Sequence, residues 1–436
     1  MVLGLLVAER SDAQDYHWHC TFSNVTYAVA FNPLSGGRVL FTSTLQLQNI
    51  FRSDDGGEHW YPSKPLDVPL PVVHQIFCLP SDTSIVFALT TGAFHSTAAL
   101  YRSTDGGQNW TATPNLGGID GEALTYEPLT DALYYGENFA GVVYKSMNHG
   151  ASWTLIGKPN AKVTLCTLGI SPDASRVLLA GSEEGVIDLS TDEGTTWSVV
   201  YQADSVQNPE VPKIVFSSHA PNVACAARWH SDRESLVMTH DRGLTWSTIA
   251  SPDPHVWALE IDQRQAACPN GNPMHLWTGL FTQNAPDTSA GGLVVESTDG
   301  GSSWHSTSFP RIPIPPSVWV LKHDTASGTL AAATDSGVFI GHEPKSAVES
   351  LLSAQSKLIL YPNPTTSTTT IALPSNAGSS VLRLSNIIGK VLFEKKLRDT
   401  RSYNLDLSGL PEGIYLVRLT SFSGPGWQGH IVRTPR

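Results

Sequence analysis

The nine residues RSTDGGQNW at positions 102–110 contain the pattern that decides the fold, because the chain repeats it. Six octets share a hydroxyl residue, then Asp or Asn, then Gly, then Trp: SDDGGEHW from Ser53, STDGGQNW from Ser103, SMNHGASW from Ser146, STDEGTTW from Ser190, THDRGLTW from Thr239 and STDGGSSW from Ser297. Their starts are 50, 43, 44, 49 and 58 residues apart. A period of about 40 to 50 residues is typical of stacked units such as the blades of a propeller.

Each octet lies between strand-like residues, such as GLVVE before Ser297 and WSVVY from Trp197, so we expect it in a hairpin loop. A short carboxylate or amide accepts hydrogen bonds from the N–H groups of its own turn, Gly suits a positive φ, and Trp offers a large apolar face between sheets. The residues given these structural roles are Asp55, Asp105, Asn148, Asp192, Asp241 and Asp299; Gly57, Gly107, Gly150, Gly194, Gly243 and Gly301; and Trp60, Trp110, Trp153, Trp197, Trp246 and Trp304.

The composition favours an all-β protein rich in turns. Of 436 residues, 41% are hydrophobic and 15% charged, and there are 36 Gly and 29 Pro, while long helical patterns are nearly absent. The five cysteines are far apart and lack metal-type spacing, so we expect buried thiols and leave one disulfide, involving Cys20 or Cys268, open. No cofactor or metal is expected.

Counting four strands to a unit gives seven units, which begin near Tyr27, Val72, Glu122, Val163, Lys213, His255 and Ser317. The seventh has neither an octet nor a fourth strand, and residues 16–22 are placed to supply the missing one. Pairing the two ends in this way removes the open sheet edges. The sequence therefore predicts a seven-bladed β-propeller over residues 15–343.

The octets resemble the Asp-box, or BNR repeat, of sialidase-like propellers, xyloglucanases, sortilin-type receptors and a photosystem assembly factor. The resemblance covers roughly residues 16–343. It implies that each box fastens the hairpin between the third and fourth strands of a blade, on the side away from the ligand face. The boxes are therefore expected to be structural.

The opposite face collects the loops that join successive blades and the loops that join second to third strands. The candidate site residues on these loops and on nearby strand starts are Asp120, Glu122 and Glu137 as catalytic acids, and Trp229, His230, His255 and His74 as ligand-binding groups. A glycosidase needs two carboxylates about 5 to 10 Å apart. Glu122 with Glu137, or Asp120 with Glu184, would supply them, although solvated loop acids are the alternative. Trp229 beside His230 is suited to stacking on a sugar or to packing between blades.

The resemblance does not extend to a known active site. The arginine triad of sialidases has too few matching arginines here, and FPRIPIP at 309–315 lies at the wrong end of the propeller. Xyloglucanases of this repeat type use two propellers, whereas this chain has room for one. Three functions stay open: a non-catalytic module that binds glycan or protein, a divergent glycoside hydrolase, and an assembly scaffold.

The last eighty residues differ from the propeller in charge and pattern. Residues 357–436 carry a net charge of +6 and the remainder −18, which supports a domain boundary with a linker at 344–357. VLRLSNIIGKVLFEKKL reads as a hairpin turning at Gly389, and SYNLDLSGLPEGIYLVRLTS as a second pair turning at 411–413. We expect a small β-sandwich over 358–436.

This segment resembles the C-terminal sorting domain of the type IX (Por) secretion system through YPNP at 361–364, NIIGKV at 386–391 and LDLSGLPEGIYLVRL at 405–419. The matching residues are Tyr361, Pro362, Asn363, Pro364, Gly389, Gly413 and Tyr415. The end, HIVRTPR, departs from the Lys-rich strand that is common in the family. The resemblance implies a bacterium of the Bacteroidetes–Chlorobi kind, the type IX machinery as a partner, and a secreted or surface-attached product.

The remaining expectations concern compartment and partners. Residues 1–14 are interpreted as a truncated signal peptide, and no later segment is long and apolar enough to span a membrane. A net charge of −12 argues against a nucleic-acid partner. A glycan or an extracellular protein is the expected ligand, and the protein is expected to be a monomer.

Overall fold

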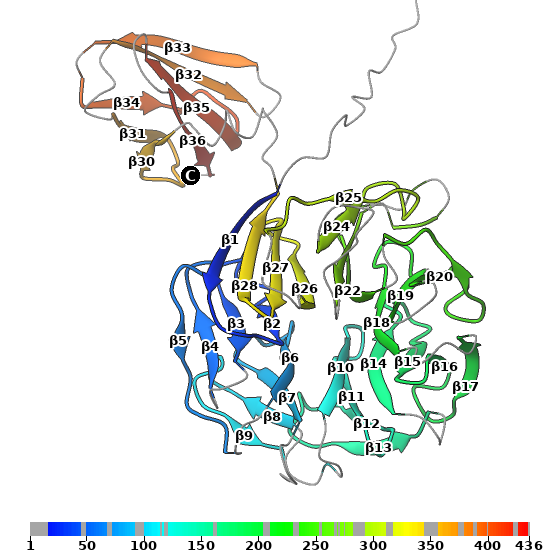
Figure 1. The fold of residues 1–436 in the computed structure, drawn as a ribbon. Helices are drawn as coiled ribbons and strands as arrows, with labels where there is room; N and C mark the ends of the chain where they lie inside the picture. The colour runs from blue at the N-terminus through cyan, green and yellow to red at the C-terminus, as the bar shows by residue number, and fades with distance from the viewer. Residues whose placement is uncertain are drawn as a thin grey trace, which may run out of the picture. The chain divides into compact units, whose positions relative to one another are not determined.

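Seven four-stranded antiparallel sheets surround one axis in the computed structural model, and their first strands face the centre (Figure 1). The structure describes residues 16–434 apart from 45–48, 68–71, 92–99, 114–115, 117–120, 160–163, 204–209, 230–234, 253–254, 266–267, 269–270, 274, 282–292, 311–316, 344–355, 374–378, 387–389, 399 and 422–425. Over these residues the chain forms strands and turns without an α-helix. The predicted all-β, seven-bladed fold is confirmed.

The strands of each blade follow one another in sequence. Blade 1 contains β2 (Val29–Phe31), β3 (Leu40–Ser43), β4 (Ile50–Ser53) and β5 (Tyr61–Pro62), and blade 2 contains β6 (Val72–Cys78), β7 (Val86–Thr91), β8 (Leu100–Ser103) and β9 (Thr111–Ala112). Blade 3 contains β10 (Gly121–Glu127), β11 (Ala132–Glu137), β12 (Val142–Ser146) and β13 (Thr154–Gly157), and blade 4 contains β14 (Leu165–Ile170), β15 (Leu178–Ser182), β16 (Val186–Ser190) and β17 (Ser198–Gln202). Blade 5 contains β18 (Glu210–Phe216), β19 (Ala224–Trp229), β20 (Leu236–Thr239) and β21 (Ser247–Thr248), and blade 6 contains β22 (Val256–Ile261), β23 (Leu276–Leu280), β24 (Val294–Ser297) and β25 (His305–Ser306).

Blade 7 is built from both ends of the propeller. Its first three strands are β26 (Val318–Asp324), β27 (Thr329–Thr334) and β28 (Gly337–His342), and its fourth is β1 (His17–Phe22), which pairs with β28 in antiparallel register. Trp18 of β1 donates its indole N–H to the Thr307 carbonyl of blade 6 at 3.0 Å. The predicted closure of the ring by residues 16–22 is therefore present, and it leaves β28 without an open edge.

The hydrophobic core lies between successive blades. Phe41 of blade 1 and Tyr101 of blade 2 share one buried cluster, and Phe87 of blade 2 and Tyr135 of blade 3 share the next. Apolar faces of adjacent sheets therefore bury one another around the ring. Cys20, Cys78, Cys225 and Cys268 are free thiols, and Cys78 and Cys225 are buried in clusters of this kind.

The six boxes form the same local network of hydrogen bonds. In the second box, Asp105 Oδ1 accepts from the backbone N–H of Gln108 at 3.0 Å and of Asn109 at 2.9 Å, and from the Ser103 hydroxyl at 2.8 Å. The Ser103 oxygen in turn accepts from the buried N–H of Gly107 at 2.9 Å. The hydroxyl residue and the glycine at the fifth position form this pair in every box, and Asn148 takes the place of Asp in the third.

The glycine at the fifth position of each box also lets the turn approach the preceding blade. Gly107 has a φ of +83°, and a Cβ on it would lie 2.5 Å from the ring of Phe41 in blade 1. Gly150 meets Phe87 of blade 2 in the same way. The box thus fastens its own hairpin and packs against the neighbouring blade, which accounts for its recurrence in blades 1 to 6.

We expect Ser103→Ala to lower the free energy of unfolding by about 1–3 kcal/mol, because the buried N–H of Gly107 then loses its acceptor. Urea unfolding followed by tryptophan fluorescence would measure the loss. Thr104→Ala is the matched control, since Thr104 is exposed in the same turn and its truncation is expected to change stability by less than about 0.5 kcal/mol. Equal stability of the two variants would contradict the role given to the serine.

The C-terminal unit contains two sheets around a core of its own. The chain divides into Met1–Pro344 and Lys345–Arg436. One sheet has the order β29 (Ser356–Lys357), β36 (Gly426–Arg433), β35 (Gly413–Ser421), β32 (Ser380–Asn386) and β33 (Val391–Leu397), and the other β30 (Ile359–Tyr361), β31 (Thr368–Ala372) and β34 (Ser402–Asp406). Buried residues of both sheets, such as Ile371 and Val417, share one cluster, as expected of a sandwich.

One predicted hairpin of this unit is present and the other is wrong. β32 and β33 pair in antiparallel register, as the sequence indicated. β34 and β35 do not pair with each other: β34 pairs with β31, and β35 lies between β32 and β36 in the other sheet. The turn at 411–413 therefore crosses from one sheet to the other, so that both faces of the sandwich core are covered.

The sorting motif joins the start of this unit to its last strand. Asn363 accepts a hydrogen bond from the backbone N–H of Val432 at 2.8 Å, and Thr369 donates to the Pro362 carbonyl at 2.9 Å. Tyr415 is buried and donates to the Pro411 carbonyl, whereas Tyr361 is exposed. Gly413 begins β35 with a φ of +147°, and Gly389 lies outside the described residues.

Candidate functional site

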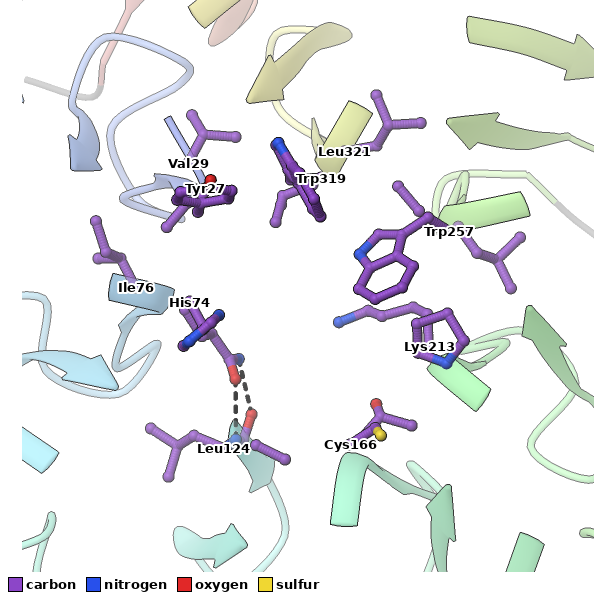
Figure 2. A pocket seen from close by; sticks show the side chains of 18 of the residues that line it. Tyr27, Val29, His74, Ile76, Leu124, Cys166, Lys213, Trp257, Trp319 and Leu321 are labelled. Carbon is purple, nitrogen blue, oxygen red and sulfur yellow. Dashed lines mark hydrogen bonds between the residues drawn. The ribbon is translucent and has the colours of Figure 1, made fainter. Parts of the chain in front are cut away.

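A cavity of about 550 Å³ lies on the propeller axis and is lined by the first strands of all seven blades (Figure 2). Its lining includes Thr91 at the end of one second strand, and Asn138 and Glu183 just after two others. In an antiparallel blade the start of the first strand and the end of the second lie at one face, and the turn between third and fourth strands lies at the other. The cavity therefore opens on the face opposite the boxes.

A β-bulge recurs at the start of the first strand. The register between first and second strands shifts at this point in blades 2 to 7. The residues at the bulge, with the corresponding position of blade 1 placed first, are Tyr27, His74, Glu122, Cys166, Pro212, Trp257 and Trp319. Bulges redirect side chains, and six of these seven residues line the cavity. The seventh is Glu122, whose side chain lies outside the described residues.

The aromatic residues at these seven positions, Tyr27, Trp257 and Trp319, form one wall of the cavity. The ring centroids of Tyr27 and Trp319 are 4.8 Å apart, and those of Trp319 and Trp257 are 5.7 Å apart. Phe281 packs against both tryptophans, at 4.6 Å from Trp319 and 5.2 Å from Trp257. Trp319 donates its indole N–H to Asp335 Oδ1 at 2.8 Å, which fixes its orientation. Neighbouring blades thus present a continuous aromatic surface to the axis.

Two lysines lie on the lining next to this wall. Lys322 Nζ is 3.4 Å from Glu260 Oε2, whereas Lys213 is partly buried and has no ion-pair or hydrogen-bond partner among the residues that the structure describes. The charge of Lys322 and then burial lower the pKa of Lys213 to about 7, against the opposing effect of Glu260. The Lys213 amine is therefore largely uncharged slightly above neutral pH.

An acidic sector lies on the lining in blades 4 and 5. Burial, followed by the charges of Glu183 and Glu184, raises the pKa of Glu210 to about 7. Glu210 begins β18, the strand that also carries Lys213, and Glu183 follows β15. The cavity therefore holds a carboxyl group and a lysine that both titrate close to neutral pH.

Of the residues expected to bind ligand, His74 lies in the cavity and hydrogen-bonds the Thr91 hydroxyl. Trp229 is buried, stacks on Phe281 at 4.8 Å and donates its indole N–H to the Phe281 carbonyl at 3.0 Å, so it packs behind the aromatic wall. The carbonyl of His255 accepts from the Phe281 N–H at 2.9 Å. His230 lies outside the described residues.

The expected catalytic acids are not brought together in the described part of the chain. Glu137 is fully buried, and its Oε2 accepts from the backbone N–H of Ala140 at 2.6 Å, which closes the turn after β11. Asp120 lies outside the described residues, as does the side chain of Glu122. Among the described residues, the acids that line the cavity are Glu183, which lies on a loop expected at this face, and Glu210, which was not predicted.

The sequence contains a signal for the aromatic wall. HVWALE at 255–260 and SVWVLK at 317–322 begin equivalent strands, and each places a tryptophan at the bulge. Comparing the first strands of all blades would have indicated these two residues. Tyr27, Lys213 and Glu210 share no pattern with their counterparts in other blades.

A second cluster of charged groups lies between blades 6 and 7 and is partly buried. Asp262, His323 and Glu343 offer ligand atoms that lie within 4.8 Å of one another, a set that suits a metal ion. The guanidinium of Arg264 forms ion pairs with both carboxylates. It lies 2.8 Å from Asp262 Oδ2 and also contacts Glu343 Oε1. Arg264 is therefore the cation that joins these carboxylates.

This cluster predicts a pH dependence of stability. Burial raises the pKa of Asp262, but hydrogen bonds from Arg264 outweigh burial and bring the pKa down to about 2. The ordinary value is about 3.9, so the stabilisation is complete above about pH 4 and is lost as the pH falls towards 2. The difference in unfolding free energy between wild type and Asp262→Asn is expected to shrink across this range in urea unfolding experiments. A difference that stays constant with pH would contradict this.

Comparison with known proteins supports the reading of both units. Residues 359–432 match the family described as the secretion system C-terminal sorting domain, and residues 101–112 match the BNR/Asp-box repeat. No curated protein matches the chain in sequence. The sorting domain marks the protein for export by the type IX system, to the cell surface or the surrounding medium. Among the described residues, no helix is long and apolar enough to cross a membrane.

Several solved structures resemble the chain in fold. YCF48 from Cyanidioschyzon merolae is 14% identical with a TM-score of 0.54, over 76% of this chain and 99% of that one. The GH74 enzyme of Niastella koreensis is 14% identical with a TM-score of 0.54, over 95% and 75%. PorZ, a surface component of the type-IX secretion system of Porphyromonas gingivalis, is 12% identical with a TM-score of 0.50, over 91% and 58%. At these identities the likeness concerns the fold alone.

Proposed function

We propose that the protein is an exported binding propeller that holds the end of a glycan chain in its axial cavity. The observation that carries this proposal is the aromatic wall formed by Tyr27, Trp257 and Trp319 next to polar groups in a cavity of about 550 Å³. A sugar ring has apolar faces that stack on aromatic side chains, and hydroxyls at its edge that need donors and acceptors. The export signal places such a module where extracellular glycans are found.

The polar groups of the cavity are suited to the edge of a sugar. Asn138, Glu183, Glu210 and the lysines lie on the lining between blades 3 and 7. The side-chain amide of Gln75, in blade 2, already has two hydrogen bonds. It accepts one from the N–H of Leu124 at 2.9 Å and donates one to the Leu124 carbonyl at 3.0 Å (Figure 2). Hydroxyl recognition is therefore assigned to the side of the cavity formed by blades 3 to 7.

Trp319→Ala is expected to weaken glycan binding by about 10-fold or more, because a stacked aromatic ring contributes about 0.5–1.5 kcal/mol beyond the area that it buries. The full chain would be screened on a glycan array, and its affinity for each hit measured by calorimetry. Tyr61→Ala, which removes an exposed aromatic ring from the outer strand β5, is the matched control and should bind normally. Unchanged binding by Trp319→Ala would exclude the aromatic wall as the site.

Glycoside hydrolysis is the second candidate, favoured by the pKa of about 7 at Glu210 with Glu183 nearby as a second carboxylate. A general acid that retains its proton near neutral pH is one half of such a site. The glycans that bind would be incubated with the protein and their products analysed. Turnover that is lost in Glu210→Gln would establish the hydrolase, and binding without turnover would establish the binding module.

A further inference from the structure

Lys213 is an unusual lysine for a binding cavity. It comes from the bulged start of β18, and its side chain extends beneath Trp257 towards the open centre (Figure 2). Lys322 has Glu260 as a partner at 3.4 Å, but no described residue pairs with Lys213. A partly buried ammonium without a partner is costly, so this position favours the neutral amine.

We infer that Lys213 is a reactive amine that captures the carbonyl carbon of a ligand in the axial cavity, namely the aldehyde at the reducing end of a glycan. This inference rests on the proposed function and specifies which end of the glycan enters. The bound aldehyde becomes a reversible imine with the Lys213 Nζ. Lys322 acts as a positioning residue, because its charge keeps Lys213 in the reactive form.

The step balances without oxidant or reductant. The lone pair of Nζ attacks the carbonyl carbon, the C–O π bond opens, and the oxygen takes a proton to give a carbinolamine. Nitrogen loses its first proton as the carbinolamine forms. The hydroxyl then leaves as water with a second proton, the nitrogen lone pair forms the C=N bond, and nitrogen loses its second proton to give the neutral imine. Glu210 lies three residues earlier on the same strand and in the same cavity. Its pKa of about 7 suits a group that supplies the proton taken by the leaving water.

The charges around Lys213 agree with this chemistry. A lysine becomes nucleophilic when it is desolvated or lies next to another cation, and the charge of Lys322, followed by burial, brings the pKa of Lys213 to about 7. Among the described residues, the other titratable groups on the lining are Tyr27, His74, Cys166, Glu183 and Glu210, and Glu260 lies next to Lys322. The Cys166 thiol also adds to aldehydes, but its adduct is not fixed by hydride reduction.

The test is reductive trapping on the full chain. The protein is incubated with glycolaldehyde and sodium cyanoborohydride at pH 7.5, and modified lysines are located by peptide mass spectrometry. Lys213 is expected to be modified at least about 10-fold faster than the exposed Lys158 in the same sample, because a lowered pKa increases the neutral fraction of the amine. Modification of Lys213 no faster than that of Lys158 would overturn the inference.

A second variant tests the mechanism without removing the amine. Lys322→Gln keeps Lys213 but removes the neighbouring charge, so the pH of half-maximal trapping at Lys213 should rise and the rate at pH 7.5 should fall. A melting curve like that of the wild type establishes that the variant is folded. A pH profile that is unchanged in a folded Lys322→Gln would overturn the role of the lysine pair.

The inference and the proposed function can fail separately. Glycans that bind would be compared with the same glycans reduced to alditols at their ends. Loss of binding on reduction supports imine capture, whereas equal binding to both forms overturns it and leaves glycan binding intact. Rapid glycolaldehyde trapping at Lys213 without binding to any glycan supports the reactive amine and overturns the glycan ligand.

Discussion

Removing residues 17–22 is expected to prevent the propeller from folding as a stable monomer. Without β1, the outer edge of β28 loses its backbone partner over the whole strand, and exposed edges of this kind promote association. Truncation of a packed tryptophan alone costs about 3–5 kcal/mol, and Trp18 packs on Phe309 at 4.8 Å and against Gly341. The combined loss is comparable with the total stability of about 5–15 kcal/mol that domains possess.

Size-exclusion chromatography and thermal unfolding would measure this effect. A chain that begins at Tyr16 is the matched control and should remain a folded monomer, since it retains the whole of β1. Trp18→Ala in the full chain gives an intermediate case, with a lower melting temperature but an intact sheet edge. A monomer that lacks residues 17–22 and melts at the wild-type temperature would show that closure of the ring contributes little.

Deletion of residues 358–436 is expected to abolish export in a bacterium that has a type IX secretion system. The matched sorting domain spans residues 359–432 and folds around a core of its own, so its removal takes away the signal and leaves the propeller strands complete. The full chain should appear at the cell surface or in the medium, and the shortened chain should remain inside the outer membrane. Immunoblotting of fractionated cells would separate the two.

The converse experiment excludes a folding defect as the cause. Residues 358–436 fused to an unrelated periplasmic protein should carry that protein across the outer membrane. The shortened propeller should still melt cooperatively when purified, because β1 to β28 lie within the first unit. Secretion of the shortened chain at the level of the full chain would show that the export signal lies elsewhere.

The propeller could be predicted because its decisive information is local and repeated. Ser103, Asp105 and Gly107 specify a turn within five residues, and six such turns at one period define the ring. The second hairpin of the C-terminal unit was wrong for the opposite reason. β34 and β35 are adjacent in sequence and both alternate, but sheet membership depends on partners far along the chain, such as β31 for one and β36 for the other.

The lining of the cavity could not be predicted in the same way. Each blade contributes only a few residues from its first strand, so Lys213 and Lys322 reach the same cavity from strands more than 100 residues apart. Only the bulged tryptophans, Trp257 and Trp319, share a local pattern, and each lysine is unremarkable in its own strand. Trp229 could not be assigned from sequence either, because its neighbours fitted stacking on a sugar as well as packing between blades. Its contacts with Phe281 show that it lies behind the aromatic wall.

The pairing of β1 with β28 also fixes where the polypeptide enters and leaves the ring. His17 lies opposite His342 in the register, and both are at the end of blade 7 that belongs to the box face. Any tether attached to either terminus of the propeller therefore starts on the side away from the ligand entrance. Immobilising the protein through these termini would leave the mouth of the cavity free, so that a propeller tethered to a surface would keep its entrance available to large ligands.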